Sequence, residues 1–324
     1  MLAIVERALD RAVYIALRAV WGIAQYVPLS VLRAGLRCVS ILVYAVDVRH
    51  RRIVEANLAL AFPDLEQAER SRLARAAFGC WGRIAAELAH ADEMATGSTL
   101  EGIRGMVARA EELGAGGRGV LALTAHTGNF ELLARLLGSI GGRRVVLFHR
   151  RMANPFVGDF LVRQRAAANV GTLGRGMVVR EALRVLARGE ILVVPLDQNQ
   201  SRKRGVFVRF FGHPACTSTM LARLSLTTGL PVQPCFAAWD GDDLVPIMGD
   251  LIQPPRLARG DDRAAAIRTL TERYTQAIEA LVRCYPAQWN WAHRRWKTQP
   301  EIDVSEAPGR PIVKSSEPKS RLTI

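Results

Sequence analysis

The chain has 324 residues, enough to bury a substantial core in one large domain or in one domain with an appended region. Hydrophobic residues make up 49% and charged residues 23%, which is ordinary for a globular protein. Lys and Arg number 44 against 30 Asp and Glu, and the net charge of +14 favours anionic partners such as membrane lipid, nucleic acid or an acidic carrier protein. The 5 cysteines are scattered and form no CxxC pair, which argues against a zinc site and a disulfide framework; we expect reduced thiols.

The N-terminal region, residues 1–47, is apolar and is predicted to form one or two helices with a break at Pro28. Acidic Glu6 and Asp10 argue against a cleavable signal peptide. The longest charge-free run, residues 19–32, is too short to span a bilayer as a helix unless the arginines that follow it reach back to the interface. The pattern therefore favours an interfacial membrane anchor over a membrane span or a buried pair of helices.

The next segments are less regular. A basic turn at 49–52 leads into an apolar stretch that ends at Pro63, and apolar spacing predicts a surface helix from about 65 to 88. Residues 114–119 formally match GxGxxG, but the β-run at 120–125 follows these glycines instead of preceding them. A plain turn is therefore favoured over a cofactor loop.

From residue 120 onward, predicted strands and helices alternate. We expect strands at 120–125, 145–148, 191–196, 232–239 and 244–248. We expect helices at 130–138, 155–168, 177–188, 217–228 and 262–284. This alternation predicts an α/β fold with a mixed, partly parallel central sheet flanked by helices, preceded by the apolar helical membrane-anchoring region. We divide the chain into that region at 1–47, the main domain at 48–300 and a disordered tail at 301–324.

The strongest local signal is the segment ThrAlaHisThrGlyAsnPheGlu at 124–131, where a buried strand ends and a polar loop begins. Asn129 is well placed to cap the following helix, which leaves His126 in the loop and Glu131 in the first helical turn. A carboxylate near one imidazole nitrogen, with the other facing a substrate, is what a general base needs. Ligands also bind at the ends of strands in α/β sheets. Taken alone, a His near a Glu is weak evidence, because such a histidine is more often structural.

Other catalytic motifs do not occur in the sequence. There is no GxSxG nucleophile elbow, no HExxH zinc motif and no phosphate-binding GxxxxGK loop. A general base that acts directly on a substrate hydroxyl is the simplest catalytic option that is left.

Several further segments carry a resemblance to one family. The pattern His126-x4-Glu131 is similar to the HxxxxD/E element of glycerolipid acyltransferases, and HisThrGlyAsnPheGlu resembles the lipid A secondary (lauroyl/myristoyl, late) acyltransferases in particular. The other matching segments follow in the family's order over roughly residues 45–300: AsnLeuAlaLeuAlaPhePro at 57–63, ArgArgMetAlaAsnPro at 150–155, ProLeuAspGln at 195–198, GlyValPheValArgPhePheGlyHisProAla at 205–215 and TyrProAlaGlnTrpAsnTrpAlaHisArgArgTrpLys at 285–297.

The resemblance implies a membrane-associated acyltransferase at the cytoplasmic face of the bacterial inner membrane. Residues 48–300 would then be the acyltransferase domain, moving a fatty acyl chain from acyl-carrier protein or acyl-CoA to a hydroxyl of a glycolipid, most simply a lipid A precursor, without metal or cofactor. His126 would be the general base, and Glu131 would orient it and stabilise the imidazolium. Further candidates for substrate binding or orientation match positions where the family carries polar groups near its active-site cleft: Arg150, Arg165, Asp197 and Arg223. Each of these arginines could instead be a surface charge or a structural ion pair, and Asp197 could cap a loop.

Three alternatives stay open. The acceptor could be another glycolipid such as a phosphatidylinositol mannoside, since relatives with that specificity often carry Asp where Glu131 stands here. The chain could also be a non-catalytic membrane-binding protein, or a thioesterase or lipase that transfers acyl groups to water. Nucleic-acid binding is disfavoured, because the basic residues are spread over the chain and not interleaved with aromatics on one platform.

Two basic clusters, at 202–204 and 293–297, could contact anionic headgroups or an acidic carrier protein, or they could be solvated faces. Three tryptophans close to the second cluster could form an interfacial belt, but burial beneath the sheet is favoured.

Overall fold

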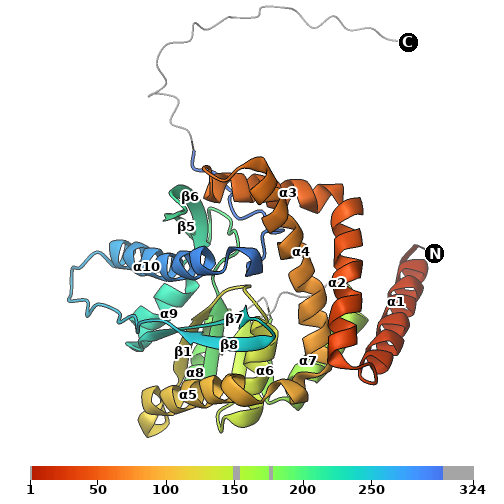
Figure 1. The fold of residues 1–324 in the computed structure, drawn as a ribbon. Coiled ribbons are helices and arrows are strands. Elements are labelled where there is room, and N and C mark those ends of the chain that lie inside the picture. The colour runs from red at the N-terminus through yellow and green to blue at the C-terminus, as the bar shows by residue number, and fades with distance from the viewer. Residues whose placement is uncertain (1, 149–153, 175–177, 302–324) are drawn as a thin grey trace, which may run out of the picture.

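The computed structural model describes residues 2–148, 154–174 and 178–301. In these ranges an N-terminal set of helices lies beside an α/β layer structure (Figure 1). The fold class predicted from the alternation of strands and helices is confirmed. The predicted disordered tail, apart from Glu301, lies outside the described residues.

Four helices make up the N-terminal part: α1 (Leu2–Ala24), α2 (Leu29–Val46), α3 (Val48–Ala61) and α4 (Gln67–Ala89). Pro28 stands at the N-terminal end of α2, so the predicted break is confirmed. The basic turn expected at 49–52 is wrong, because these residues lie in the first part of α3. Asp47 caps that helix by accepting a hydrogen bond from the His50 backbone N–H at 3.0 Å, which allows the arginines to follow as helical residues.

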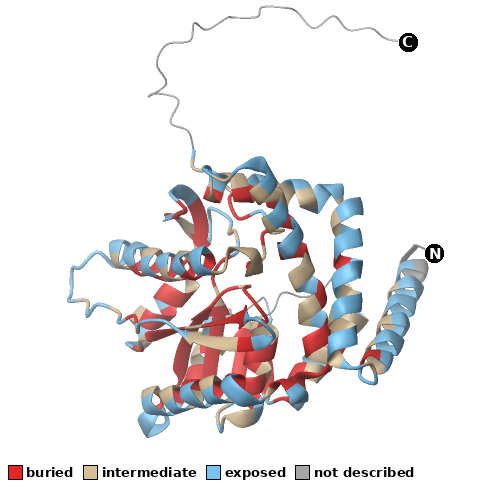
Figure 2. Cartoon of the chain, viewed as in Figure 1, coloured by how far each residue is buried: buried red, intermediate tan, exposed pale blue. Residues whose placement is uncertain are grey.

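Helix α2 packs closely along α4. A Cβ atom on Gly82 of α4 would lie 2.4 Å from the carbonyl oxygen of Leu36 on α2, so only glycine permits this approach. The opposite side of α2 and most of α1 are exposed although they are apolar, as Figure 2 shows in pale blue. Over the described residues, α2 is the one helix long and apolar enough to cross a membrane, with mean hydropathy 1.7 over 18 residues. By length and composition alone this is weak support for a span.

The connection to the sheet contains elements that the sequence did not suggest. A short 3₁₀ helix, η1 (Ala91–Met94), leads to α5 (Gly97–Leu113), and a second one, η2 (Ala115–Gly117), precedes the first strand. The glycine-rich segment at 114–119 is therefore a turn between a helix and a strand, as expected.

The central sheet has six strands in the order β3-β2-β4-β1-β7-β8. Their bounds are β1 (Val120–Thr124), β2 (Val145–Phe148), β3 (Val170–Leu173), β4 (Ile191–Pro195), β7 (Val232–Asp240) and β8 (Asp243–Met248). The first five in the sheet order are parallel, and only β8 runs antiparallel, beside β7. Strand β3 was not predicted, since its short segment ValGlyThrLeu lacks a distinct apolar pattern.

Both faces of the sheet are covered, which explains why the central strands are apolar throughout. On β1, Val120 and Ala122 face a core shared with α5 and α6 (Phe130–Ile140), whereas Leu121 and Leu123 face a second core. That second core includes residues of α8 (Val178–Ala187), α9 (Met220–Thr228) and α10 (Arg263–Cys284). Helix α7 (Pro155–Ala167) connects β2 with β3.

A hairpin of β5 (Gly205–Phe210) and β6 (His213–Ser218) stands apart from the main sheet and contacts α10. The hairpin was not predicted, although its sequence carries part of the family resemblance. After α10, the short helix η3 (Pro286–Gln288) opens a C-terminal segment that returns to the sheet. The tryptophans of this segment, Trp289, Trp291 and Trp296, are buried, as the sequence favoured.

Candidate active site

The loop between β1 and α6, residues 125–129, is shaped by its local sequence. Asn129 accepts a hydrogen bond from the Leu132 backbone N–H at 3.0 Å and so caps α6, as predicted. Gly128 has a φ of +48°, and a Cβ there would lie 2.5 Å from the Ala237 carbonyl oxygen. The loop thus passes too close to β7 for any larger residue, which holds His126 at the carboxyl end of the sheet.

Asp197 holds the imidazole of His126. One carboxylate oxygen lies 2.8 Å from His126 Nδ1, and the other accepts the His126 backbone N–H at 2.9 Å. Trp289 Nε1 donates to that second oxygen at 2.8 Å. Because β1 and β4 are parallel neighbours with Thr124 opposite Pro195, the residues just past each strand end meet at the same edge of the sheet.

Burial and charge act on this pair in opposite directions. Burial disfavours the imidazolium and lowers the pKa of His126, but the attraction and hydrogen bond of Asp197 outweigh it, with a smaller contribution from the negative charge of Glu131. The pKa of His126 is therefore raised above the ordinary 6.5. Burial raises the pKa of Asp197, yet His126 and Trp289 overcome this and hold the carboxyl group well below its usual range. Asp197 is thus a carboxylate throughout the neutral range.

The other ring nitrogen of His126 remains accessible. The side chain is 20% exposed, against 2% for Asp197. Nε2 lies 3.3 Å from the amide nitrogen of Gln198, an exposed residue next to Asp197. With Nδ1–H bonded to the carboxylate, Nε2 carries the lone pair, which can accept a proton from a group that takes the place of the Gln198 amide.

Glu131 does not have the place expected for it. It accepts hydrogen bonds from the Arg165 guanidinium of α7, one of them from Nε at 3.0 Å, in a two-pronged ion pair. The prediction that Glu131 orients His126 is therefore wrong in its geometry, because the carboxylate bonded to the imidazole is Asp197. Glu131 lies in the first turn of α6, on the side that faces α7. It acts on the pKa of His126 through its charge.

Of the remaining predicted site residues, two lie near His126 or Glu131 and one lies elsewhere. Arg165 is buried beside Glu131, and Asp197 contacts the imidazole directly instead of capping a loop. Arg223 is exposed on α9 and donates to the Thr219 hydroxyl at 3.0 Å; within the described residues it makes no hydrogen bond or ion pair with the His126 loop. Arg150 lies outside the described residues.

The C-terminal segment closes over the loop. Gly128 donates its N–H to the Gln288 carbonyl at 3.0 Å, and Asn290 donates to the His126 carbonyl at 3.0 Å. Arg295 is fully buried over the Phe210 ring, and its burial lowers the pKa of the guanidinium to about 10. The cluster at 293–297 is thus structural only in part, because Arg295 is buried whereas Arg294 and Lys297 are exposed.

A small cavity of about 40 Å³, lined mostly by apolar side chains, lies between α5, α6 and the sheet. Phe130 lines this cavity and also places its ring edge-to-face with the His126 ring, at 4.7 Å between centroids. The other lining residues include Met106, Leu113, Thr124, Ala134 and Leu137. Within the described residues, no group of three or more His, Cys, Asp or Glu side chains is placed to hold a metal ion.

Comparison with known proteins shows the family of this chain. The family described as bacterial lipid A biosynthesis acyltransferase matches residues 4–298. This chain belongs to that family. It is therefore an acyltransferase, and its family membership covers the N-terminal apolar helices as well as the sheet.

Individual acyltransferases of the family are similar over most of their length. The lipid A biosynthesis lauroyltransferase of Escherichia coli (strain K12) is 28% identical over 269 residues, which cover 78% of this chain and 81% of that enzyme. The corresponding myristoyltransferase of the same strain is 24% identical and covers 77% and 76%. The lipid A biosynthesis acyltransferase of Haemophilus influenzae (strain ATCC 51907 / DSM 11121 / KW20 / Rd) is 25% identical and covers 79% and 80%.

The sequence did not reveal three features of this candidate site: the role of Asp197 as partner of His126, the Gln198 amide beside Nε2 and the cover formed by residues 288–290. A signal for the first was present, because ProLeuAspGln directly follows an apolar strand in the same way as ThrAlaHis follows another. Two polar groups that follow parallel strands meet only if the strands are neighbours, and the sequence does not show strand order.

Proposed function

We propose that this protein transfers a fatty acyl chain from a thioester donor, acyl-carrier protein, to a hydroxyl of a lipid A precursor at the cytoplasmic face of the bacterial inner membrane. The observation that carries the proposal is the His126 imidazole, which is bonded to Asp197 through Nδ1 and accessible at Nε2. The names of the similar enzymes support the acceptor.

In this mechanism His126 Nε2 removes the proton from the acceptor hydroxyl as its oxygen attacks the thioester carbonyl carbon. Asp197 stabilises the imidazolium that forms and keeps Nε2 facing the substrate. When the tetrahedral intermediate collapses, the carbon–sulfur bond breaks and the imidazolium returns its proton to the leaving thiolate. No covalent acyl-enzyme is needed.

Two further groups have supporting roles in the proposal. The Gln198 amide lies at hydrogen-bond distance from Nε2, where it would hold the reacting oxygen in line with the base. The Glu131 carboxylate favours the imidazolium through its charge, and its ion pair with Arg165 holds it in the first turn of α6.

The protein has one surface that suits the acyl chain and others that suit the membrane and the carrier protein. Phe130 contacts both the His126 ring and the cavity between α5, α6 and the sheet, whose 40 Å³ would take the end of an acyl chain with a gain of about 0.8 kcal/mol per buried methylene. The exposed apolar sides of α1 and α2 suit an interfacial seat on anionic lipid. Lys203 and Arg204 are exposed and would receive an acidic carrier protein.

The test is an acyl-transfer assay with purified protein, radiolabelled acyl-carrier protein or acyl-CoA, and a panel of lipid acceptors. We expect labelled lipid A precursor with the carrier-protein donor, and a loss of about 10²-fold or more in His126→Ala that stays folded. Undiminished transfer by His126→Ala would reject the mechanism. Label found only in free fatty acid would indicate a hydrolase, and label on a phosphatidylinositol mannoside would change the acceptor.

A further inference from the structure

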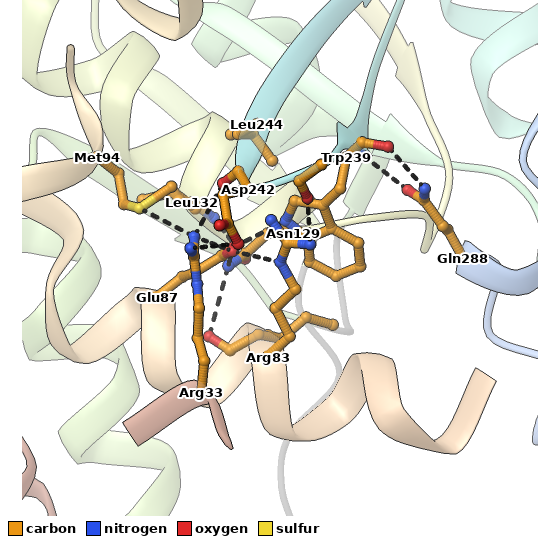
Figure 3. A network of polar contacts seen from close by, with 12 residues as sticks. Arg33, Arg83, Glu87, Met94, Asn129, Leu132, Trp239, Asp242, Leu244 and Gln288 are labelled. Atoms are coloured by element: carbon orange, nitrogen blue, oxygen red, sulfur yellow. Dashed lines mark hydrogen bonds and ion pairs between the residues drawn. The ribbon is translucent and has the colours of Figure 1, made fainter. Parts of the chain in front are cut away.

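A second buried carboxylate, Glu87 on α4, lies away from the His126–Asp197 pair. Its side chain is fully buried and accepts four hydrogen bonds, two on each oxygen (Figure 3). The donors come from four elements: Arg33 of α2 at 2.8 Å, Arg83 of α4 at 2.7 Å, Asn129 of the β1–α6 loop at 3.0 Å and Trp239 of β7 at 2.9 Å. One carboxylate therefore joins an apolar N-terminal helix to the loop that carries His126.

The two guanidiniums balance the charge of Glu87. Each has a second anchor, because Arg33 also donates to the Asp242 carbonyl and carboxylate, at 3.0 and 3.1 Å, and Arg83 donates to the Gly241 carbonyl at 2.8 Å. Arg83 also lies over the Trp239 ring at 4.6 Å. Removing one partner of a buried ion pair leaves an uncompensated charge, which strongly perturbs the groups around it.

Asn129 connects this network with the site. Its side-chain oxygen caps α6 and its amide nitrogen donates to Glu87, so both ends of the side chain are engaged. Trp239 is linked to Gln288 by two hydrogen bonds, and the Gln288 carbonyl in turn accepts the Gly128 N–H. Two separate paths thus run from Glu87 to the residues directly after His126.

We propose that Arg33 and Glu87 are positioning residues for His126, acting through Asn129, so that α2 is a structural part of the catalytic site as well as an apolar surface. Arg33 holds the Glu87 carboxylate, Glu87 holds the Asn129 amide, and Asn129 sets the loop on which the imidazole lies. The expected effect on the rate of acyl transfer rests on the proposed function. The structural link between α2 and the loop is independent of that function.

The test compares Arg33→Ala with Arg37→Ala, a matched control one turn further along α2 whose side chain is exposed. With a detergent-dispersed acceptor, we expect kcat of Arg33→Ala to fall by on the order of tenfold or more with KM little changed, since a small misplacement of a base is costly. Arg33→Lys should recover part of the rate, and Arg37→Ala should match the unmodified protein. Equal rates in the two alanine variants would overturn the inference.

A second variant separates the link from general destabilisation. Asn129→Ser keeps a side-chain oxygen that caps α6 but removes the amide that reaches Glu87. We expect Asn129→Ser to lower kcat as Arg33→Ala does. The double variant should have a kcat within about twofold of the slower single variant, because both substitutions break the same path. Multiplied effects in the double variant, or full activity of Asn129→Ser, would contradict the proposal.

Hydrogen exchange gives a readout that needs no activity. The backbone amides of residues 126–132 should exchange faster in Arg33→Ala than in Arg37→Ala, while those of β1 and β4 remain protected. If the unmodified protein shows no acyl transfer but this exchange difference is found, the proposed function fails and the link holds. If transfer occurs and the exchange is the same in both variants, the link fails and the function holds.

Discussion

At the scale of single residues, the site depends on which carboxylate meets His126. Asp197 lies 71 positions further along the chain and bonds both the ring and the backbone of His126, whereas Glu131 in the adjacent helix turn bonds Arg165. A carboxylate with two hydrogen bonds to one residue fixes both the ring orientation and the loop. Asp197 is therefore the group on which the basicity of His126 chiefly depends.

The pH dependence of acyl transfer tests that assignment. A base with a raised pKa is protonated and inactive at low pH, so the rate of the unmodified enzyme should rise with a midpoint above pH 6.5. In Asp197→Asn the attraction is lost while burial still lowers the pKa of His126, so the midpoint should move to lower pH and the plateau should fall by about 10²-fold or more. Measuring kcat/KM across the neutral range gives both values.

Glu131→Gln serves as the control in the same experiment, because Glu131 contributes less to the pKa of His126 than Asp197 does. Its midpoint should move in the same direction but by less. A larger shift in Glu131→Gln than in Asp197→Asn would restore Glu131 as the principal partner.

At the scale of elements, the β1–α6 loop is held by close backbone contact with β7 and by the segment after α10. Thr127 donates its hydroxyl to the Ala237 carbonyl at 3.1 Å and forms an isolated antiparallel bridge with Trp289. These contacts leave no room above Gly128. The loop is thus rigid for steric reasons, and not only because of its hydrogen bonds.

Gly128→Ala should destabilise the protein more than an ordinary glycine substitution at positive φ. We expect a loss of roughly 2–4 kcal/mol in the free energy of unfolding, the sum of about 1–2 kcal/mol for the left-handed conformation and the clash with Ala237. Gly229→Ala, at φ +69° with open space around it, should lose only the first part. Urea denaturation of both variants makes the comparison, and equal losses would show that β7 moves aside easily.

The cavity between α5 and α6 allows a test of chain selection. Ala134 lines the cavity, so Ala134→Leu should shorten the space and reduce kcat/KM for longer acyl donors relative to shorter ones, by about fourfold per excluded methylene. Ala182→Leu adds the same volume to the opposite core of the sheet and should leave the ratio unchanged. An unchanged preference in Ala134→Leu would place the acyl chain elsewhere.

At the scale of the whole molecule, two features favour contact with an anionic membrane surface: the positive net charge and the exposed apolar side of α1 and α2. The net charge is +14, and α2 exposes Leu42 and Val46 at 66% and 77%. Apolar burial and attraction to anionic lipid add in interfacial binding. Helix α2 thus has an exposed apolar side and a side that is fastened to α4 and Glu87.

Binding to lipid vesicles should reflect both contributions. We expect the protein to sediment with vesicles that contain anionic lipid and to be released progressively as salt is raised, because each basic residue near the surface contributes about 1 kcal/mol. Leu42→Asp should weaken binding at every salt concentration. Met248→Asp, an exposed apolar position on β8, should not. Vesicle binding that changes neither with salt nor in Leu42→Asp would argue against this surface as the membrane-binding site.

Features that depend on neighbouring residues could be predicted from the order of amino acids alone. The α/β class follows from apolar runs alternating with helical spacing, the α6 cap from Asn129, and the place of His126 from the polar loop that ends a buried strand. The family resemblance is likewise a property of ordered local segments, and the family match over residues 4–298 confirms it.

Features that depend on strand order and helix packing could not be predicted in this way. Asp197 replaces Glu131 at the imidazole because β1 and β4 are neighbours in the sheet, while the first turn of α6 faces Arg165. Arg33 and Asn129 meet on Glu87 because Gly82 lets α2 approach α4. Such contacts join residues that are far apart in the chain, and periodicity in one segment carries no information about which other segment will lie against it.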